Sequence, residues 1–187
     1  ADTSNSSAIS FDPNTVNSFI MAYQDGGNSN YGTVVVGTVS GTSLTFGTES
    51  VFNSAATYAV TVAFDPNTAG KFIVAYADGG NGTYATVKAG TISGSSITYG
   101  SAAVFSSVYV YDYSISFDPN TANSFVISHA DGYGKVVVGT LSGVVITLGS
   151  VYTYNATSTN NPEVSFDPST ANKFVITYSD GNSAIGT

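Results

Sequence analysis

The side chains that could do chemistry in this chain are few, and most of them are acidic. The 187 residues contain twelve Asp and Glu, four Lys, one His, and no Cys or Arg. Two carboxylates at a suitable separation are enough for glycoside hydrolysis. Glu49, Asp112 and Glu163 are the acids outside the recurring turns and the N-terminus. They are therefore the candidates for a carbohydrate-active enzyme, although their spacing in the sequence pairs none of them.

His129 is the only histidine, at the position that Tyr23, Tyr76 and Tyr178 hold in the other repeats. This predicts an aromatic core position rather than a catalytic base or a metal ligand. Without a second His or a Cys, a transition-metal centre has little support, and no Gly-x-Ser-x-Gly elbow is present for a serine hydrolase. Segment 10–15 loosely resembles the Asp-box turn of sialidases, but those enzymes hold the substrate carboxylate with arginines. The absence of Arg excludes that class.

The loops that begin Asp-Gly are similar to the calcium loops of integrin-type propellers. The first reads Asp-Gly-Gly-Asn-Ser-Asn-Tyr over 25–31. Calcium loops place several oxygen ligands in alternation, and the EF-hand pattern adds a distal Glu. Each loop here offers one acid and no Glu follows. We therefore predict ordinary turns and no cofactor or metal, with a structural calcium as the alternative.

The composition limits the partners. Hydrophobic residues make up 42% of the chain, which supports a packed core, but charged residues only 9%, against roughly 25% in ordinary soluble domains. A surface of Ser, Thr, Asn, Gly and Tyr suits an extracellular or virion-surface protein. A net charge of −8 without Arg argues against nucleic acid and anionic lipid as partners. No apolar run is long enough for membrane insertion.

One segment recurs through the chain at a nearly fixed period. Phe-Asp-Pro-Asn begins at Phe11, Phe64 and Phe117, and Phe-Asp-Pro-Ser begins at Phe166, so the spacings are 53, 53 and 49 residues. Such a period indicates one structural unit repeated along the chain. We divide the single repeat domain 1–187 into unit 1 (1–54), unit 2 (55–107), unit 3 (108–156) and a partial unit 4 (157–187).

Each unit has the residue pattern of four short strands. In unit 1 they are 8–11, 18–23, 33–39 and 43–52, rich in β-branched and aromatic residues and separated by Asp-Pro-Asn-Thr, Asp-Gly and Ser-Gly turns. Four antiparallel strands in about 53 residues are typical of a β-propeller blade. A stacked β-solenoid has shorter rungs, and a β-sandwich would not explain the repetition. The predicted fold is all-β, a propeller-like array of three full blades and one partial blade.

Antiparallel strands send successive turns to opposite ends of a unit. The uniform Asp-Pro-Asn-Thr and Ser-Gly turns therefore share one end, and the variable Asp-Gly loops share the other with the connections between units. Unit 3 is four residues shorter in its Asp-Gly loop, which marks an exposed segment. Tyrosines 109, 111 and 113 alternate by two, so they would project together from an extended strand. The predicted ligand-binding residues at this end are Asn28, Asn30, Tyr31, Asn81, Tyr84, Tyr109, Tyr111, Tyr113 and Tyr133.

The joined repeat includes Phe-Asp-Pro-Asn-Thr-Ala-Asn-Lys-Phe-Val, Asp-Gly-Gly-Asn-Ser-Asn-Tyr and Val-Val-Val-Gly-Thr-Val-Ser-Gly. Over essentially the whole chain it resembles the degenerate repeats of long structural proteins of marine tailed bacteriophages. The resemblance implies a virion-associated or cell-surface role, such as a tail-fibre or host-attachment component, and brings no catalytic residues. The chain departs from the pattern in its shortened third loop, at His129, and at Ile185 where unit 1 has Tyr31.

The sequence leaves three functions open. We expect a non-enzymatic recognition module that binds a glycan or a host-surface receptor through the loop end rich in Tyr, Asn and Asp. The first alternative is a purely structural assembly protein whose copies contact one another through the uniform turns. The second is a carbohydrate-active enzyme. Because unit 4 stops half way, self-association or a place in a longer chain is expected as well.

Overall fold

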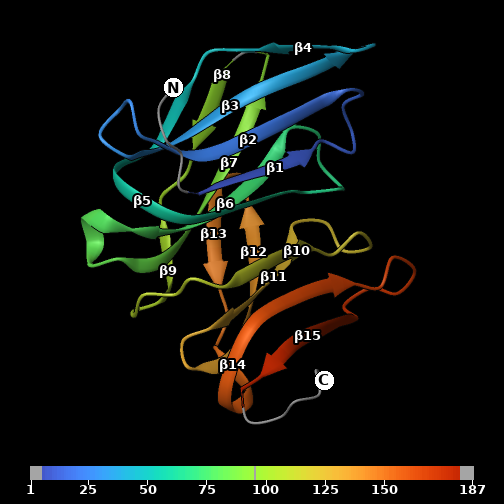
Figure 1. Ribbon diagram of the computed structural model, residues 1–187. Helices are drawn as coiled ribbons and strands as arrows, with labels where there is room; N and C mark the ends of the chain where they lie inside the picture. Colours follow the sequence, from blue (N-terminus) through green and yellow to red (C-terminus); the bar gives the residue numbers. More distant parts are fainter. Residues whose placement is uncertain (1–5, 95, 182–187) are drawn as a thin grey trace.

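The computed structural model describes residues 6–94 and 96–181, and this part of the chain is built from β-strands (Figure 1). The one helical element described is a single 3-10 turn, η1 (Gly79–Asn81). All strand pairs are antiparallel. The prediction of an all-β fold with antiparallel sheets is confirmed. No helix in the described residues is long and apolar enough to cross a membrane.

Units 1 and 2 form one continuous hydrogen-bonded sheet, ordered β1-β2-β3-β5-β6-β7-β8. β4 pairs with β3, and β9 pairs with β7, at the outer edges of the two units. The strands are β1 (Ser7–Phe11), β2 (Ser18–Asp25), β3 (Tyr31–Ser40), β4 (Ser43–Phe46), β5 (Ser50–Phe64), β6 (Lys71–Asp78), β7 (Tyr84–Ser93), β8 (Ser96–Tyr99) and β9 (Ala103–Ser106).

Units 3 and 4 form a second sheet, ordered β10-β11-β12-β14-β15, with β13 paired to β12. In Figure 1 the colours run from β1–β4 at one end of the molecule to β14 and β15 at the other. The strands are β10 (Tyr113–Phe117), β11 (Ser124–Ala130), β12 (Tyr133–Ser142), β13 (Val145–Leu148), β14 (Tyr152–Phe166) and β15 (Phe174–Asp180).

Two 15-residue strands, β5 and β14, each belong to two units. The first part of β5 pairs with β3, and from Thr57 onward it pairs with β6. A bulge lies in the second part, where Ala59 has a φ of 50°. β14 repeats this bulge at Asn161, with a φ of 49°. A bulge bends a strand and increases its twist, so one strand can end one unit and begin the next.

The predicted fourth strand of unit 1 is interrupted in the structure. β4 and the start of β5 both pair with β3, but residues 47–49 between them are not in a strand. Gly47 leaves the ladder by donating its N–H to the Val36 carbonyl at 2.8 Å. The corresponding Gly100 and Gly149 donate to Ala89 and Val138 in the same way.

Each unit has one sheet face with large apolar side chains and one with smaller ones. In β6 of unit 2, Phe72, Val74 and Tyr76 point toward unit 1, whereas Ile73 and Ala75 point toward unit 3. All five are at most 1% exposed. We call the first the large-residue face and the second the small-residue face. The hydrophobic clusters of the described residues lie between units, where the large-residue face of one packs on the small-residue face of the unit before it.

The uniform turns also join consecutive units. Asp12 Oδ1 accepts the Asn14 N–H of its own turn at 2.9 Å, and Asp12 Oδ2 accepts the Gly70 N–H of unit 2 at 2.9 Å. The Asn14 side-chain amide donates to the carbonyls of Asp65 and Pro66 in unit 2. The Asp-Pro-Asn turn is therefore a connection to the following unit, in addition to reversing its own chain.

Candidate functional site

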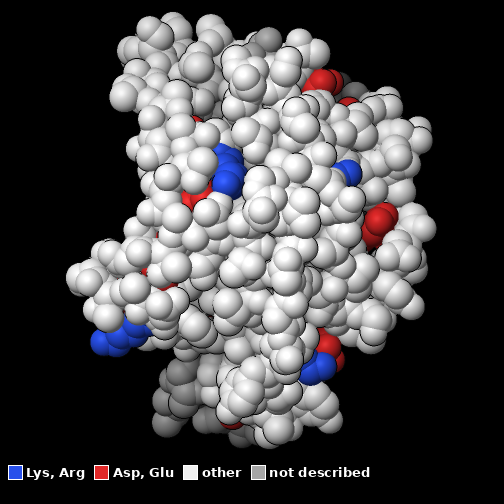
Figure 2. Space-filling model, turned by 180° about the vertical axis from the view of Figure 1, so that it is seen from behind, with Lys and Arg blue, Asp and Glu red and all other residues white. Residues whose placement is uncertain are grey.

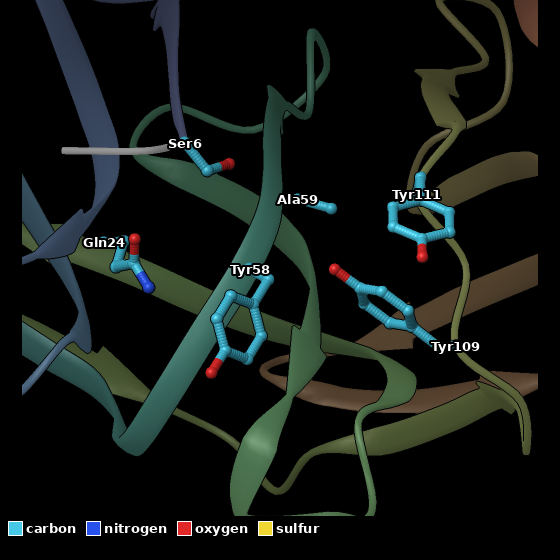
Figure 3. Close-up of a pocket in the computed structure, with 6 residues that line it drawn as sticks. All are labelled: Ser6, Gln24, Tyr58, Ala59, Tyr109 and Tyr111. Atoms are coloured by element: carbon cyan, nitrogen blue, oxygen red, sulfur yellow. The ribbon is translucent and has the colours of Figure 1, made fainter.

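A pocket of about 300 Å³ opens where units 1, 2 and 3 meet, at the end of the units that holds the Asp-Gly loops (Figure 3). In this view Tyr109 and Tyr111 lie on one side of it, a serine and a glutamine from unit 1 lie on the other, and Tyr58 lies between them. Ser6 precedes β1, and Gln24 lies near the end of β2. The lining residues are Ser6, Gln24, Tyr58, Ala59, Tyr109 and Tyr111.

The three tyrosine rings form a chain of edge-to-face contacts. The Tyr58 and Tyr109 centroids are 6.4 Å apart, and those of Tyr109 and Tyr111 are 4.3 Å apart. Tyr58 and Tyr109 are about one-third exposed, and Tyr111 is 70% exposed. Burial raises the pKa of Tyr109, with smaller contributions from Tyr111 and Tyr58. Its hydroxyl is therefore neutral at physiological pH and can both donate and accept a hydrogen bond.

Gln24 supplies a buried polar group beside these rings. Its side chain is 2% exposed, and Oε1 has no hydrogen-bond partner in the described residues. A buried amide oxygen without a partner is costly, and a rotation of the Gln24 side chain toward the pocket would let a ligand hydroxyl donate to it. Its backbone is fixed by a 3.0 Å bond from the Gln24 N–H to the Ser6 carbonyl.

Tyr113 does not line the pocket but binds a residue that does. Residues 107–112 are not in a strand, so the expected alternation of 109, 111 and 113 does not apply. The Tyr113 hydroxyl donates to the Ala59 carbonyl, and its ring packs 5.7 Å from that of Phe105. Burial raises the pKa of Tyr113 well above its ordinary value. Its hydroxyl is thus used within the protein, where it binds the backbone of Ala59, a residue that lines the pocket.

The other predicted binding residues lie in the loops after β2 and β6 or at the first residues of β3, β7 and β12, and none of them lines the pocket. Asn28 and Tyr31 form a turn bond, and the Asn30 carbonyl accepts the Thr57 N–H at 3.0 Å. Asn81 is the last residue of η1. Tyr84 begins β7 and is 36% exposed, and Tyr133 begins β12 and is 52% exposed. The structure brings Tyr109 and Tyr111 together with Tyr58, and leaves these six at the ends of three separate hairpins.

The three candidate catalytic acids are divided between two regions. Glu49 Oε1, in unit 1, accepts the Tyr23 hydroxyl at 2.6 Å. Asp112 Oδ2 accepts the Asn161 N–H at 3.3 Å, and Glu163 Oε2 accepts the Ser114 hydroxyl at 2.7 Å, both where units 3 and 4 meet. No group of three or more His, Cys, Asp or Glu that could hold a metal is found among the described residues.

The acids of the Asp-Gly loops have structural partners. Asp25 Oδ1 accepts the Gly27 N–H at 3.0 Å, and Asp78 Oδ1 accepts the Gly80 N–H at 2.9 Å. Asp78 is also held by the Asn53 side-chain amide at 3.0 Å, and Asp131 pairs with Lys135 at 2.7 Å. These carboxylates therefore stabilise turns and junctions between units.

Four of the six lining residues were not predicted from the sequence, and for two of them, Tyr58 and Gln24, the repeat contains a signal. Tyr58 lies 53 residues before Tyr111, one full period, so both occupy the same position of successive units. Gln24 stands where units 2 and 3 have Ala77 and Ala130. A long polar residue replacing alanine at a core-facing position is the departure that would have pointed to this pocket.

Comparison with known proteins identifies the fold but no family. No protein-family model matches the sequence, and no curated protein matches it. The structure is similar to Sqt1 from Saccharomyces cerevisiae, with 14% identity and a TM-score of 0.60 over 95% of this chain and 44% of that one. Sqt1 from Chaetomium thermophilum gives 14% and 0.58 over 95% and 43%. The chain spans less than half the length of either, and at this identity the likeness concerns the fold alone.

Proposed function

We propose that this chain is a non-enzymatic recognition module, a propeller-like array displayed on a virion or cell surface, which binds a neutral carbohydrate in the tyrosine pocket. The observation that supports this most directly is the cluster of Tyr58, Tyr109 and Tyr111 beside the unpartnered amide oxygen of Gln24. Tyrosine offers an apolar ring for the face of a sugar and a hydroxyl for its rim.

The size and charge of the site narrow the ligand. About 300 Å³ is at the lower limit for small-molecule pockets, so one terminal sugar residue is the expected occupant. The chain has no Arg and a net charge of −8, and no Lys lines the pocket. Charged side chains are few and scattered on the face in Figure 2. A sialylated or sulfated sugar would lack a counter-charge, which favours a neutral hexose.

Glycan-array binding followed by calorimetry tests the proposal. Tyr109→Ala and Tyr111→Ala should each weaken binding at least about tenfold, since each removes a stacking ring. Gln24→Ala is a milder change because alanine occupies this position in units 2 and 3, and it should weaken binding with no loss of folding. Tyr152→Ala is the matched control, a tyrosine 68% exposed outside the pocket.

Two results would contradict the glycan-binding proposal. One is no binding on a broad array of neutral saccharides. The other is a bound saccharide whose affinity is unchanged by the three pocket substitutions but lost in Tyr152→Ala.

A purely structural repeat protein is the second candidate, and the turn bonds favour it. The Asp12 and Asn14 side chains of unit 1 are used for contacts with unit 2, so these turns build the array itself. Under this alternative the pocket would bind no saccharide, and variants of its lining would change only stability.

A further inference from the structure

The outer face of unit 1 exposes large apolar side chains. Ile9, Phe11, Leu44 and Phe46 are between 55% and 58% exposed. The strand registers place all four on the large-residue face of unit 1, the same face as the buried ring of Phe19. Phe11 and Phe46 pack against that ring at 5.5 and 6.0 Å. These residues form one continuous apolar surface rather than scattered exposed positions.

The same face is buried in every other unit. Phe11 is 57% exposed, whereas its equivalents one, two and three repeats later, Phe64, Phe117 and Phe166, are 6%, 6% and 9% exposed. In each of those units the cover is the small-residue face of the unit before it, as for Ile20 and Ala22 against Phe64. The three junctions within the chain therefore show what kind of surface fits the exposed face of unit 1.

The complementary surface is exposed at the other end of the chain. In β15 of unit 4, Val175, Thr177 and Ser179 face away from unit 3 and are exposed, Val175 by 64%. The residues equivalent to Val175 in units 1 to 3 are Ile20, Ile73 and Val126, each at most 1% exposed. In the described residues, unit 4 thus presents the part of the small-residue face that its second strand contributes, which a large-residue face covers elsewhere in the chain.

The hydrogen bonds between the Asp-Pro-Asn turns and the following unit run in the same direction along the chain. In the junctions of units 1 with 2 and 3 with 4, an Asp of the earlier unit accepts an N–H from a residue of positive φ in the later unit, Gly70 or Asn172. Asn17 of unit 1 has the same conformation, with a φ of 61°, and Asp167 of unit 4 is the equivalent acceptor. Ser169 replaces the turn Asn of the other units, so one bond of this set would be missing.

We propose that a second copy of this chain docks head to tail, with the small-residue face of its unit 4 on the large-residue face of unit 1. The contact continues an interface that the chain already makes three times. If two large-residue faces met, the aromatic rings of one would lie against the aromatic rings of the other. Each junction within the chain instead pairs a large-residue face with a small-residue face. The chain overlays less than half of the longer Sqt1 fold, so a second copy in continuation would extend the array over most of that length.

Sedimentation equilibrium and native mass spectrometry of the whole chain test this contact. At about 100 μM, where even a weak specific interface is populated, we expect dimers or longer head-to-tail oligomers, because such a contact either closes or propagates. Phe11→Asp and Val175→Arg should each raise the dissociation constant at least about tenfold. The control Val104→Asp, at a position 43% exposed on the outer strand of unit 2, should associate like the wild type.

Mixing the two variants identifies the polarity. Phe11→Asp keeps an intact unit 4 face and Val175→Arg keeps an intact unit 1 face, so the mixture should form a heterodimer through one native interface. Leu44→Asp serves as a second unit 1 variant, and circular dichroism confirms that each variant is folded. A wild type that stays monomeric at this concentration overturns the proposal. The proposal is also overturned if Phe11→Asp abolishes association while Val175→Arg leaves it unchanged, because that result means that two unit 1 faces pair with each other.

Discussion

At the scale of single residues, His129 shows how the repeat uses a titratable group in its core. The side chain is 0% exposed, and neither ring nitrogen has a hydrogen-bond partner in the described residues. Its ring lies 5.3 Å from Phe105, as Tyr76 lies 5.0 Å from Phe52 one unit earlier. Burial lowers the pKa of His129 to about 4, against an opposing effect of Asp131 and a reinforcing one of Lys135. The prediction of an aromatic core position is confirmed.

This histidine should make the stability of the protein depend on pH. Between pH 6.5 and 4 the unfolded chain binds a proton that the folded His129 does not, so stability is full above 6.5 and falls with decreasing pH. The expected loss is about 3 kcal/mol by pH 4. Urea unfolding at pH 7.5 and 4.5 measures it. His129→Tyr should abolish this loss, and Tyr76→His should add a second loss of the same kind. If the free energy of unfolding fell equally between pH 7.5 and 4.5 in the wild type and in His129→Tyr, the explanation would be wrong.

The carboxylates contribute in a separate pH range. Asp118 is buried, which raises its pKa, but backbone bonds from Asn172 and Asn120 and bonds from Thr121 lower it below 3.8 overall. The pKa of Asp167 is lowered by its backbone and side-chain bonds from Ser169. Stability from these two groups is present above pH 3.8 and is lost only below it. A measurement at pH 4.5 therefore reports mainly on His129.

The candidate site was only partly predictable at this scale. Tyr109 and Tyr111 stood out because the connection before unit 3 is rich in tyrosine, but Tyr113 lies in the same run and is used internally. Tyr58 and Gln24 reach the pocket from units 2 and 1. Their convergence depends on how units 1, 2 and 3 pack against one another, and a repeat period contains no information about that packing.

At the scale of elements, the turn residues made the strands predictable. How consecutive strands and units are connected was not predictable. Asp-Pro-Asn-Thr, Asp-Gly and Ser-Gly mark reversals that the structure contains. The continuous strand β5 was missed because its bulge is at Ala59, a residue that rarely adopts a positive φ. The break at 47–49 depends on a bond from Gly47 to Val36. The inter-unit role of Asp12 was also hidden, since its partner Gly70 is 58 residues away.

The third strand of each full unit contains a glycine that the fold requires for reasons of space. Gly37, Gly90 and Gly139 lie directly opposite Phe19, Phe72 and Phe125 in the neighbouring strand. In each case an added Cβ would overlap the phenylalanine ring. The aromatic ring covers the glycine and so fills the gap left by the missing side chain.

Gly90→Ala should therefore destabilise the protein by about 1–3 kcal/mol, the usual cost of forcing extra volume into a packed core. The expected result in urea is a lower midpoint with an unchanged m-value. Gly47→Ala is the matched control, because its Cβ would meet nothing nearer than the Val36 carbonyl at 3.5 Å. A Gly90→Ala variant as stable as this control would show that Phe72 can move aside without cost.

At the scale of the whole molecule, each unit is stabilised by packing against the units next to it in the sequence. The clusters join unit 1 to 2, unit 2 to 3, and unit 3 to 4. Unit 2 is covered on both faces, and every residue of β6 except Asp78 is buried. Unit 4 has one neighbour in the chain, and no residue of β15 is fully buried. Stability in such an array is the sum of unit and interface contributions, so it should be uneven along the chain.

Hydrogen exchange should reveal this gradient. In dilute protein, amides of β15 (Phe174–Asp180) should exchange by local opening well before those of β6 (Lys71–Asp78), because opening β15 disrupts one interface and opening β6 disrupts two. Pulse labelling with mass spectrometry on peptides covering the two strands measures the difference. Equal protection in dilute solution would mean that the array unfolds as one unit and that the interfaces are not independent. If a second copy covers unit 4, protection of β15 should rise with protein concentration while that of β6 stays the same, and Phe11→Asp should remove this rise without altering β15 in dilute protein.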